Sequence, residues 1–358
     1  MHRNQHTLTK ERLVFAVKNY AANLLLIWPV IALYRYNPYY VKLLRPEAQT
    51  VLLWLALAYT VGAFIYYLYS LFVPRENGPE SESKGLIILR GLRKYAKRIR
   101  HYLGTFTSYP ALPLPKLEKR EKTAVLFAII KIYYLPLMLH YCFNNYYAFQ
   151  KDLARIDFSQ FRFQPEFFSN ALSPALVPLV FMIDTAYFGF GYAFEAGFLR
   201  NKVKSVEPTV LGWTVALVCY LPFSGIFAGY IGWRVGSEMV TAATPLLTFL
   251  MRTVIILLLF IYLWATLALG TKCSNLTNRG IVTGGPYAFV RHPAYIAKNL
   301  VWWVASVTVM NAAVFFSICV WSFIYFLRAI TEERHLIADP DYQAYCRTVK
   351  WRFVPGVY

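Results

Sequence analysis

The stretch LLTFLMRTVIILLLFIYLWATLALG, residues 246–270, is an apolar run of 25 residues interrupted by one charge, Arg252. A helix of that length extends about 37 Å, which exceeds the roughly 30 Å hydrocarbon core of a bilayer. A bilayer core has no water to pair with backbone N–H and C=O groups, so a spanning structure must pair them internally. The run therefore predicts a transmembrane helix.

Seven more apolar segments lie on either side of this run. They are residues 12–34, 48–73, 124–148, 172–196, 209–231, 294–309 and 312–329. The last two are short, because a helix of about 16 residues extends only about 24 Å. The pattern predicts an all-α fold, a multi-pass transmembrane helical bundle of about eight membrane segments with a C-terminal helical hairpin.

The composition also indicates a membrane protein. The 358 residues are 58% hydrophobic and 15% charged, which leaves too little polar surface to cover a soluble domain of this size. The net charge of +19 does not indicate nucleic-acid binding, because the basic residues cluster in loops between apolar runs. Five isolated cysteines without a CxxC pair predict neither a disulfide framework nor a metal site.

The loop charges predict the orientation in the membrane. If the N-terminus is cytosolic, the inner regions carry 24 lysines and arginines, and the outer loops carry 7. Without the long loop 74–123, to which the positive-inside rule applies less strictly, the inner count still leads by 12 to 7. We therefore expect both termini in the cytosol, in a bacterial inner membrane or an ER-type membrane.

The loop 74–123 contains a second pattern. Residues 85–103 carry apolar side chains at helical spacing, among them Ile88, Leu92 and Ile99, with basic residues on the other faces. This pattern is typical of a helix that lies on a membrane surface, and a solvated linker helix is the alternative.

Charged residues in or near the apolar segments include Lys131, Asp184, Glu195, Arg252 and Lys298. Glu195 and Lys298 lie near predicted cytosolic ends, where a side chain can reach the interface. A charge at the bilayer centre costs about 2.5–3.5 kcal/mol, so each needs a partner, a cavity or a route to the interface. An ion pair of Asp184 with Arg252 is compatible with the spacing, and so is a site for a lipid headgroup or an ion. The sequence leaves their role open.

Residues 284–295, GGPYAFVRHPAY, join two apolar segments near the C-terminus. Pro293 suits the first turn of a helix, where its missing N–H costs nothing. His292 would then lie beside the free N–H groups and the positive dipole end of that helix, which favour an anionic ligand. The hairpin returns at Glu332 and Glu333, so these carboxylates and His292 are expected on one cytosolic face.

Four motifs in this order, GGPYAFVRHPAY, EERHL, DYQAYC and RFVP, resemble those of the isoprenylcysteine carboxyl methyltransferase family. The wider group includes the phospholipid methyltransferases and, more distantly, the sterol reductases. The resemblance covers roughly residues 264–358. It implies S-adenosylmethionine as the cofactor, S-adenosylhomocysteine as the product, and a cofactor pocket at the cytosolic interface.

The resemblance and the chemistry of this cofactor together suggest candidate roles. Helix-start N–H groups and a histidine suit its carboxylate, an acidic side chain suits its cationic end or ribose hydroxyls, and tyrosines can stack on adenine. The candidate cofactor-binding residues are Gly285, Pro286, Tyr287, His292, Pro293, Tyr295 and Glu332. The candidate catalytic residues are Arg291, Arg352 and Glu333. No metal ligand is expected.

One position departs from the family pattern. Ala297 stands where many members have a glycine two residues after the motif tyrosine. Alanine still permits a cofactor to approach closely, though less so than glycine. Lys298 follows it and is placed to contact the acceptor or the cofactor carboxylate.

The predicted function is methyl transfer from S-adenosylmethionine to a lipophilic acceptor, either an isoprenylcysteine-type carboxylate or a lipid headgroup. Residues 246–358 are expected to bind the methyl donor, and residues 1–245, with the basic segment 74–123, to form the acceptor pocket. The expected partner is a membrane lipid or a lipidated small molecule, not nucleic acid, and the oligomeric state stays open. The alternatives are an NADPH-dependent oxidoreductase like the sterol reductases, and a lipid-binding or transport protein without enzymatic activity.

Overall fold

The computed structural model describes residues 10–71, 82–104, 116–160 and 164–357. The chain divides into two compact units, Met1–Ile132 and Tyr133–Tyr358. Helices dominate both units, and the strands among the described residues are one antiparallel pair of two residues each. The all-α prediction is therefore confirmed.

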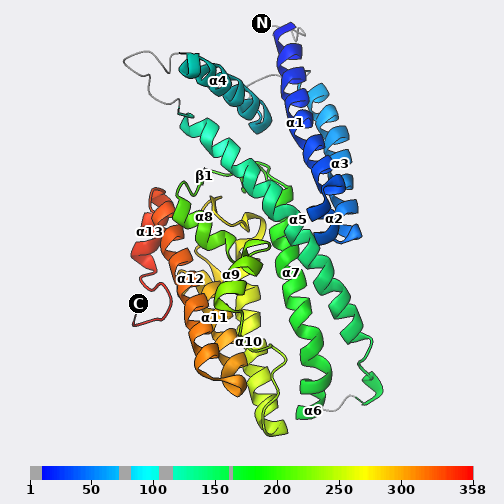
Figure 1. The fold of residues 1–358 in the computed structure, drawn as a ribbon, viewed down its shortest axis with the longest axis vertical. Helices are drawn as coiled ribbons and strands as arrows, with labels where there is room; N and C mark the ends of the chain where they lie inside the picture. The colour runs from blue at the N-terminus through cyan, green and yellow to red at the C-terminus, as the bar shows by residue number, and fades with distance from the viewer. Residues whose placement is uncertain (1–9, 72–81, 105–115, 161–163, 358) are drawn as a thin grey trace, which may run out of the picture. The chain divides into compact units, whose positions relative to one another are not determined.

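The described residues of the N-terminal unit form four helices and the first part of a fifth: α1 (Lys10–Tyr36), α2 (Pro38–Leu43), α3 (Pro46–Ser70), α4 (Lys84–Gly104) and α5 (Lys119–Leu153). Helices α1 and α3 lie side by side (Figure 1). The fully buried Asn19 of α1 accepts a hydrogen bond from the backbone N–H of Ser83 at 2.7 Å, just before α4 begins. At Gly85, a Cβ atom would lie 2.2 Å from the Asn23 side chain, so only glycine permits this close approach of α4 to α1.

Helix α4 matches the predicted amphipathic segment 85–103. Ile87 and Ile88 pack against Ala124 of α5, whereas Arg93 and Arg98 are exposed. A helix with one apolar face and one basic face suits a membrane surface. The interfacial position of α4 stays a prediction.

The C-terminal unit continues α5 and adds a compact helical bundle. Its elements are α6 (Pro165–Phe167), the π-helical turn η2 (Phe168–Leu172), α7 (Ser173–Ala193), β1 (Ser205–Val206), α8 (Val210–Leu217), α9 (Phe223–Ile231), α10 (Pro245–Leu269), the 3₁₀ turn η3 (Gly270–Lys272), β2 (Thr277–Asn278), the 3₁₀ turn η4 (Gly285–Ala288), α11 (Pro293–Ser306), the 3₁₀ turn η5 (Val307–Val309), α12 (Ala312–Leu336) and α13 (Pro340–Thr348). Strand β1 pairs antiparallel with β2, with Ser205 opposite Asn278.

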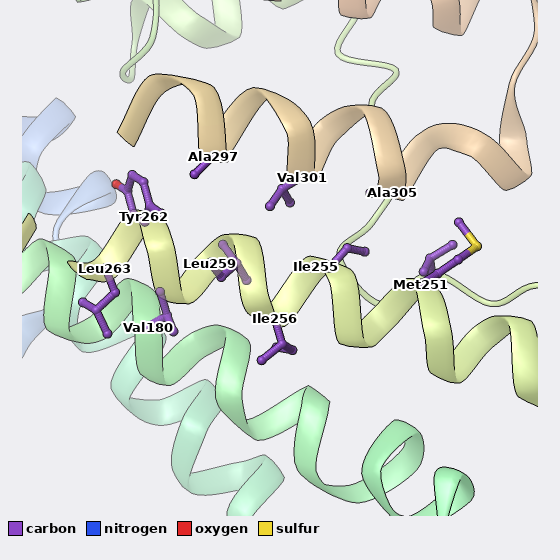
Figure 2. Close-up of a cluster of buried hydrophobic side chains, with 11 residues drawn as sticks. Val180, Met251, Ile255, Ile256, Leu259, Tyr262, Leu263, Ala297, Val301 and Ala305 are labelled. Carbon is purple, nitrogen blue, oxygen red and sulfur yellow. The ribbon is translucent and has the colours of Figure 1, made fainter. Parts of the chain in front are cut away.

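Helix α10 forms the centre of this unit, packed between α7 and α11 (Figure 2). Ile255 and Leu259 of α10 are almost completely buried, and Val301 of α11 lies against them. The small residues Ala297 and Ala305 on the same face of α11 let the two backbones approach closely. Such close packing, more than hydrophobic burial, holds helices together inside a bilayer.

Six helical segments in the described part of the chain are long and apolar enough to cross a membrane. They are Lys10–Tyr36, Pro46–Tyr69, Lys119–Leu153, Pro165–Ala193, Pro245–Lys272 and Ala312–Leu336. The chain is thus a multi-pass membrane protein, and the predicted C-terminal hairpin is present as α11 and α12.

The predicted number of eight spans is not confirmed. The apolar segment 209–231 forms two short helices, α8 and α9, of 8 and 9 residues. The chain turns between them over residues 218–222, and Pro222 is the residue just before α9. Helix α11 has 14 residues and extends about 21 Å, less than a bilayer core.

The ion pair considered for Asp184 and Arg252 does not form. Arg252 instead donates to backbone carbonyl groups: to Val240 through Nε at 2.8 Å, to Met239 through Nη2 at 3.2 Å, and to Ser169 through Nη1. These bonds tie the loop before α10 to the π-helical turn that precedes α7. Arg252 is therefore a structural residue, and Asp184 has other partners, described below.

Candidate functional site

A cavity of about 350 Å³ lies in the C-terminal unit, within the range of small-molecule sites. Its walls come from α5, α7, α8, α10, α11, α12 and the loops next to β1 and β2. Five of the candidate residues line it: Tyr287, Arg291, His292, Tyr295 and Glu332. The cavity is therefore the place where the motif 284–295 and the Glu-Glu pair meet in space.

The backbone around the motif 284–295 is held in an unusual shape. Gly285 has φ +62°, and a Cβ atom there would lie 3.3 Å from Ala268 and from the ring nitrogen of Trp264. Glycine is therefore favoured at this position both by conformation and by space. Pro286 is buried in the short turn η4, and Pro293 begins α11 as the sequence predicted. These three candidates shape the wall rather than line the cavity.

The C-terminal segment pairs with the Arg-His motif. The backbone N–H of Arg291 donates to the carbonyl of Trp351 at 2.9 Å, and that of His292 donates to the carbonyl of Arg352 at 3.0 Å. The Arg291 guanidinium also donates to the carbonyl of Lys350 at 3.3 Å. These bonds join residues 291–292 to residues 351–352 next to the cavity.

Glu333 lies at the centre of a buried charge network. Its Oε1 atom lies 3.1 Å from His292 Nε2 and 3.4 Å from Arg291 Nε, and its Oε2 atom accepts from Arg352 Nε at 2.6 Å. A carboxylate only accepts hydrogen bonds, so Nε2 of His292 must be the protonated nitrogen. In the neutral ring, Nδ1 is then left as an acceptor.

This network separates the three candidate catalytic residues. Arg291 lines the cavity, whereas Glu333 and Arg352 lie outside its lining. The last two contact His292 and the C-terminal segment, and they fix the orientation of the imidazole ring.

Tyr295 and Glu332 form a second polar pair at the cavity. The Tyr295 hydroxyl donates to Glu332 Oε2 at 2.8 Å. The Tyr295 ring also stacks on His292, with the ring centres 5.4 Å apart and nearly parallel planes. The predicted meeting of the Arg-His-Pro motif with the Glu-Glu pair is therefore present in the fold.

Helix α13 covers the motif from outside. The Tyr345 hydroxyl donates to the carbonyl of Tyr287 at 2.7 Å. Asp339 caps α13 and accepts from Asn278 at 2.8 Å and from Lys204 at 2.9 Å. Burial opposes ionisation of Asp339, but these hydrogen bonds and the Lys204 charge outweigh it and hold the pKa below its usual range.

Glu207 is a cavity residue that the sequence analysis missed. Its side chain is almost fully buried and Oε1 accepts from the Thr209 N–H at 3.0 Å and from Arg334 at 3.3 Å. Oε2 is buried without a hydrogen-bond partner among the residues that the structure describes. Nothing in the local sequence separates this glutamate from an ordinary loop charge.

The deeper end of the cavity is also polar, although apolar helices surround it. Asp184 accepts from the hydroxyls of Tyr262 at 2.8 Å and Thr266 at 2.6 Å. Asn275 accepts from Arg328 at 3.0 Å. The sequence analysis missed Arg328, which lies inside an apolar run. Its spacing of four residues from Glu332 predicts that both side chains lie on the same face of the helix.

Comparison with known families agrees with this geometry. Residues 240–339 match the family model of the phospholipid methyltransferases. The matched range holds the whole of α10, α11 and α12, and every candidate site residue except Arg352. Neither a curated protein nor a solved structure matches the chain.

Proposed function

We propose that this multi-pass membrane protein, whose residues 240–339 match the phospholipid methyltransferase family model, transfers a methyl group from S-adenosylmethionine to a lipophilic acceptor. The observation that carries the proposal is one cavity in which Tyr287, His292, Tyr295 and Glu332 lie together, all inside the matched range. The family match supports methyl transfer, and the shared cavity supports a common ligand for these residues.

The residues of the cavity fit this cofactor chemically. Its ammonium and ribose hydroxyls need acceptors, which Glu332 and the unpaired Oε2 of Glu207 supply. Its carboxylate suits a site beside the start of α11, where backbone N–H groups and the helix dipole favour an anion. Its adenine suits the aromatic faces of Tyr287 and Tyr295.

When bound, S-adenosylmethionine supplies a methyl group on a positively charged sulfur, which needs an aligned nucleophile more than an acid or a base. The protein then acts chiefly by holding the acceptor in line and by excluding water. Such positioning contributes about 7–11 kcal/mol to a barrier at best. The small size of the cavity and its walls of packed helices suit that task.

The three candidate catalytic residues have different roles in this proposal. Arg291 lines the cavity and is the catalytic candidate, because its charge can neutralise an anionic acceptor. Glu333 and Arg352 are positioning residues, since they hold His292 through the buried network.

We further propose a division of labour along the chain. Residues 246–358, together with Glu207, bind the methyl donor, and the other cavity residues before 246 supply the acceptor side. In the C-terminal unit that side is the wall formed by α5, α7 and α8, with Met138, Phe181 and Phe188 as apolar contacts. The loop charges support a cytosolic mouth for the cavity.

Isothermal titration of the detergent-purified protein with S-adenosylhomocysteine tests the proposal. Saturable binding at one site is expected, together with no binding of NADPH. Binding of NADPH without S-adenosylhomocysteine would instead establish the oxidoreductase alternative, and binding of neither would refute a cofactor site of either kind.

A further inference from the structure

We infer that the second half of α4, residues 92–104, binds the anionic headgroups of a lipid leaflet. This inference goes beyond the proposed function, because it concerns the N-terminal unit and does not involve the methyl donor. The amphipathic sequence of this helix suits either a membrane surface or a solvated linker. The burial of its side chains favours the membrane surface.

The protein packs only against the first part of α4. All of the buried residues of this helix lie there: Gly85, Leu86, Ile87, Ile88 and Gly91. Ile87 and Ile88 pack against Ala124 of α5. From residue 92 to residue 104, no side chain of α4 is buried in the described structure. Most helix stability in proteins comes from tertiary packing of an apolar face, and the protein supplies little of it to this half.

An uncovered apolar stripe runs along the second half of α4. It consists of Leu92, Ala96, Ile99 and Leu103, whose spacing places them on one face of the helix. Leu92 is 48% exposed and Leu103 is 65% exposed. An apolar face on a helix that is otherwise charged is suited to burial at the boundary between lipid headgroups and acyl chains.

A basic stripe lies next to the apolar stripe. Arg93, Lys97 and Arg100 are exposed, and their spacing places them on the adjacent face. Among the described residues, none of these three forms an ion pair with a carboxylate. Their N–H donors are therefore available to an external acceptor, and phosphate oxygens are acceptors of the matching charge.

The nearby carboxylates pair with other cations of α4. Glu82 pairs with Arg90, and both Glu118 and Glu121 pair with Lys94, the second at 3.5 Å. Helix α4 carries seven lysines and arginines and no acidic residue, so these cations exceed the three glutamates by four. An excess of positive charge attracts a leaflet that contains anionic lipid.

A lipid leaflet is the occupant that fits both stripes. Leucine side chains enter the acyl boundary while the neighbouring basic side chains reach the phosphates. A nucleic acid would meet the charges but leave the leucines in water. Helix α4 also lies between two candidate membrane spans in the chain, Pro46–Tyr69 and Lys119–Leu153, so a bilayer surface is always within its reach. The loop charges predict the cytosolic side for it, where anionic lipids are concentrated.

The test measures hydrogen exchange of the full-length protein in lipid nanodiscs by mass spectrometry. One set of discs is pure phosphatidylcholine, and the other also contains phosphatidylglycerol, which has a net negative charge. The amides of residues 92–104 report on the second half of α4. The amides of residues 85–91 are the internal reference, because the protein itself covers this part. A sample in detergent without lipid is measured beside both.

Two matched triple variants separate the position of the charge from its amount. The first removes the basic stripe: Arg93→Gln, Lys97→Gln and Arg100→Gln. The control removes three exposed cations of other helices: Arg35→Gln, Lys42→Gln and Lys151→Gln. A further double variant, Leu92→Ser with Leu103→Ser, removes the two leucines of the apolar stripe and keeps every charge.

In the wild type, exchange of residues 92–104 should slow about tenfold or more when phosphatidylglycerol is present, and added salt should reverse part of this effect. The basic-stripe variant should lose most of the slowing, and the control should keep it. The double leucine variant should exchange faster than the wild type in both kinds of disc. Residues 85–91 should exchange equally in all of these samples.

Equal exchange of residues 92–104 in both kinds of disc would overturn the inference. Fast exchange in both would establish a solvated linker helix, and slow exchange in both would establish an apolar contact without headgroup recognition. Slowing that survives in the basic-stripe variant, or that the control loses to the same extent, would also overturn it. Equally slow exchange in detergent would show that the protein alone holds this half of α4. None of these results involves S-adenosylhomocysteine, so the proposed function would stand.

Discussion

Replacing Glu333 with glutamine should release the C-terminal segment from the motif 291–293. The carboxylate accepts hydrogen bonds from His292 and Arg352, forms an ion pair with Arg291 at 3.4 Å, and is 8% exposed. The glutamine amide keeps one acceptor oxygen. Its NH2 group is a donor, and it would face either His292 or Arg352, which are donors themselves. Loss of a hydrogen bond to a charged group costs about 1.5–3 kcal/mol, and breaking a fully buried pair costs about 3–5 kcal/mol.

The expected cost lies between these limits, because Arg352 is 28% exposed and water can replace part of its bond. We expect the local opening free energy of the segment to fall by about 2–4 kcal/mol. The backbone amides of Arg291 and His292 report this opening, since they donate to the carbonyls of Trp351 and Arg352. Their hydrogen exchange should accelerate roughly 30- to 700-fold.

Hydrogen exchange with mass spectrometry on the detergent-purified protein measures this rate. The neighbouring Glu332→Gln is the matched control, because Glu332 is exposed and bonds only Tyr295 in the described structure. Exchange at residues 291–292 should then stay within a few-fold of the wild type. Equal protection in Glu333→Gln and the wild type would refute the account of the network as the clamp on His292.

Three further changes have expected outcomes. Glu332→Gln should weaken binding of S-adenosylhomocysteine about tenfold in calorimetry, and an unchanged affinity would remove this residue from the site. Gly285→Ala should lower thermal stability by about 1–2 kcal/mol, because an L residue is strained at φ +62°; equal melting would argue against that strained turn. Asp339 has a lowered pKa, so its contribution is present above its unfolded value of about 3.9 and is lost as the pH falls through the folded value. Asp339→Asn should therefore destabilise the protein at neutral pH by about 1 kcal/mol and little at low pH, and a pH-independent difference in denaturation would contradict this sign.

The parts of the fold that the sequence predicted are those set by local pattern. Apolar runs specify helices and their approximate limits. A single polar residue can also mark a helix start, as Asn311 does by capping α12. The number of spans was not predictable in this way. Mean apolarity cannot tell a continuous span from two short helices, and the difference at 209–231 is the turn over residues 218–222.

The residues of the candidate site likewise include some that the sequence predicts and some that it does not. The Arg-His-Pro motif and the Glu-Glu pair were recognisable because each is a short cluster at the end of an apolar segment. Glu207 was not, since only the pairing of β1 with β2 brings its loop to the cavity. Arg328 did carry a signal, its helical spacing from Glu332, but the apolar run around it concealed that relation.

The central claim is tested most directly by methyl transfer itself. Purified protein in vesicles made from a total lipid extract is incubated with S-adenosylmethionine labelled in its methyl group, and the organic-soluble products are separated by mass spectrometry. We expect label in a membrane lipid, and much less label with Glu332→Gln. Absence of labelled lipid from a protein that binds S-adenosylhomocysteine would contradict the claim that this cavity methylates a membrane acceptor.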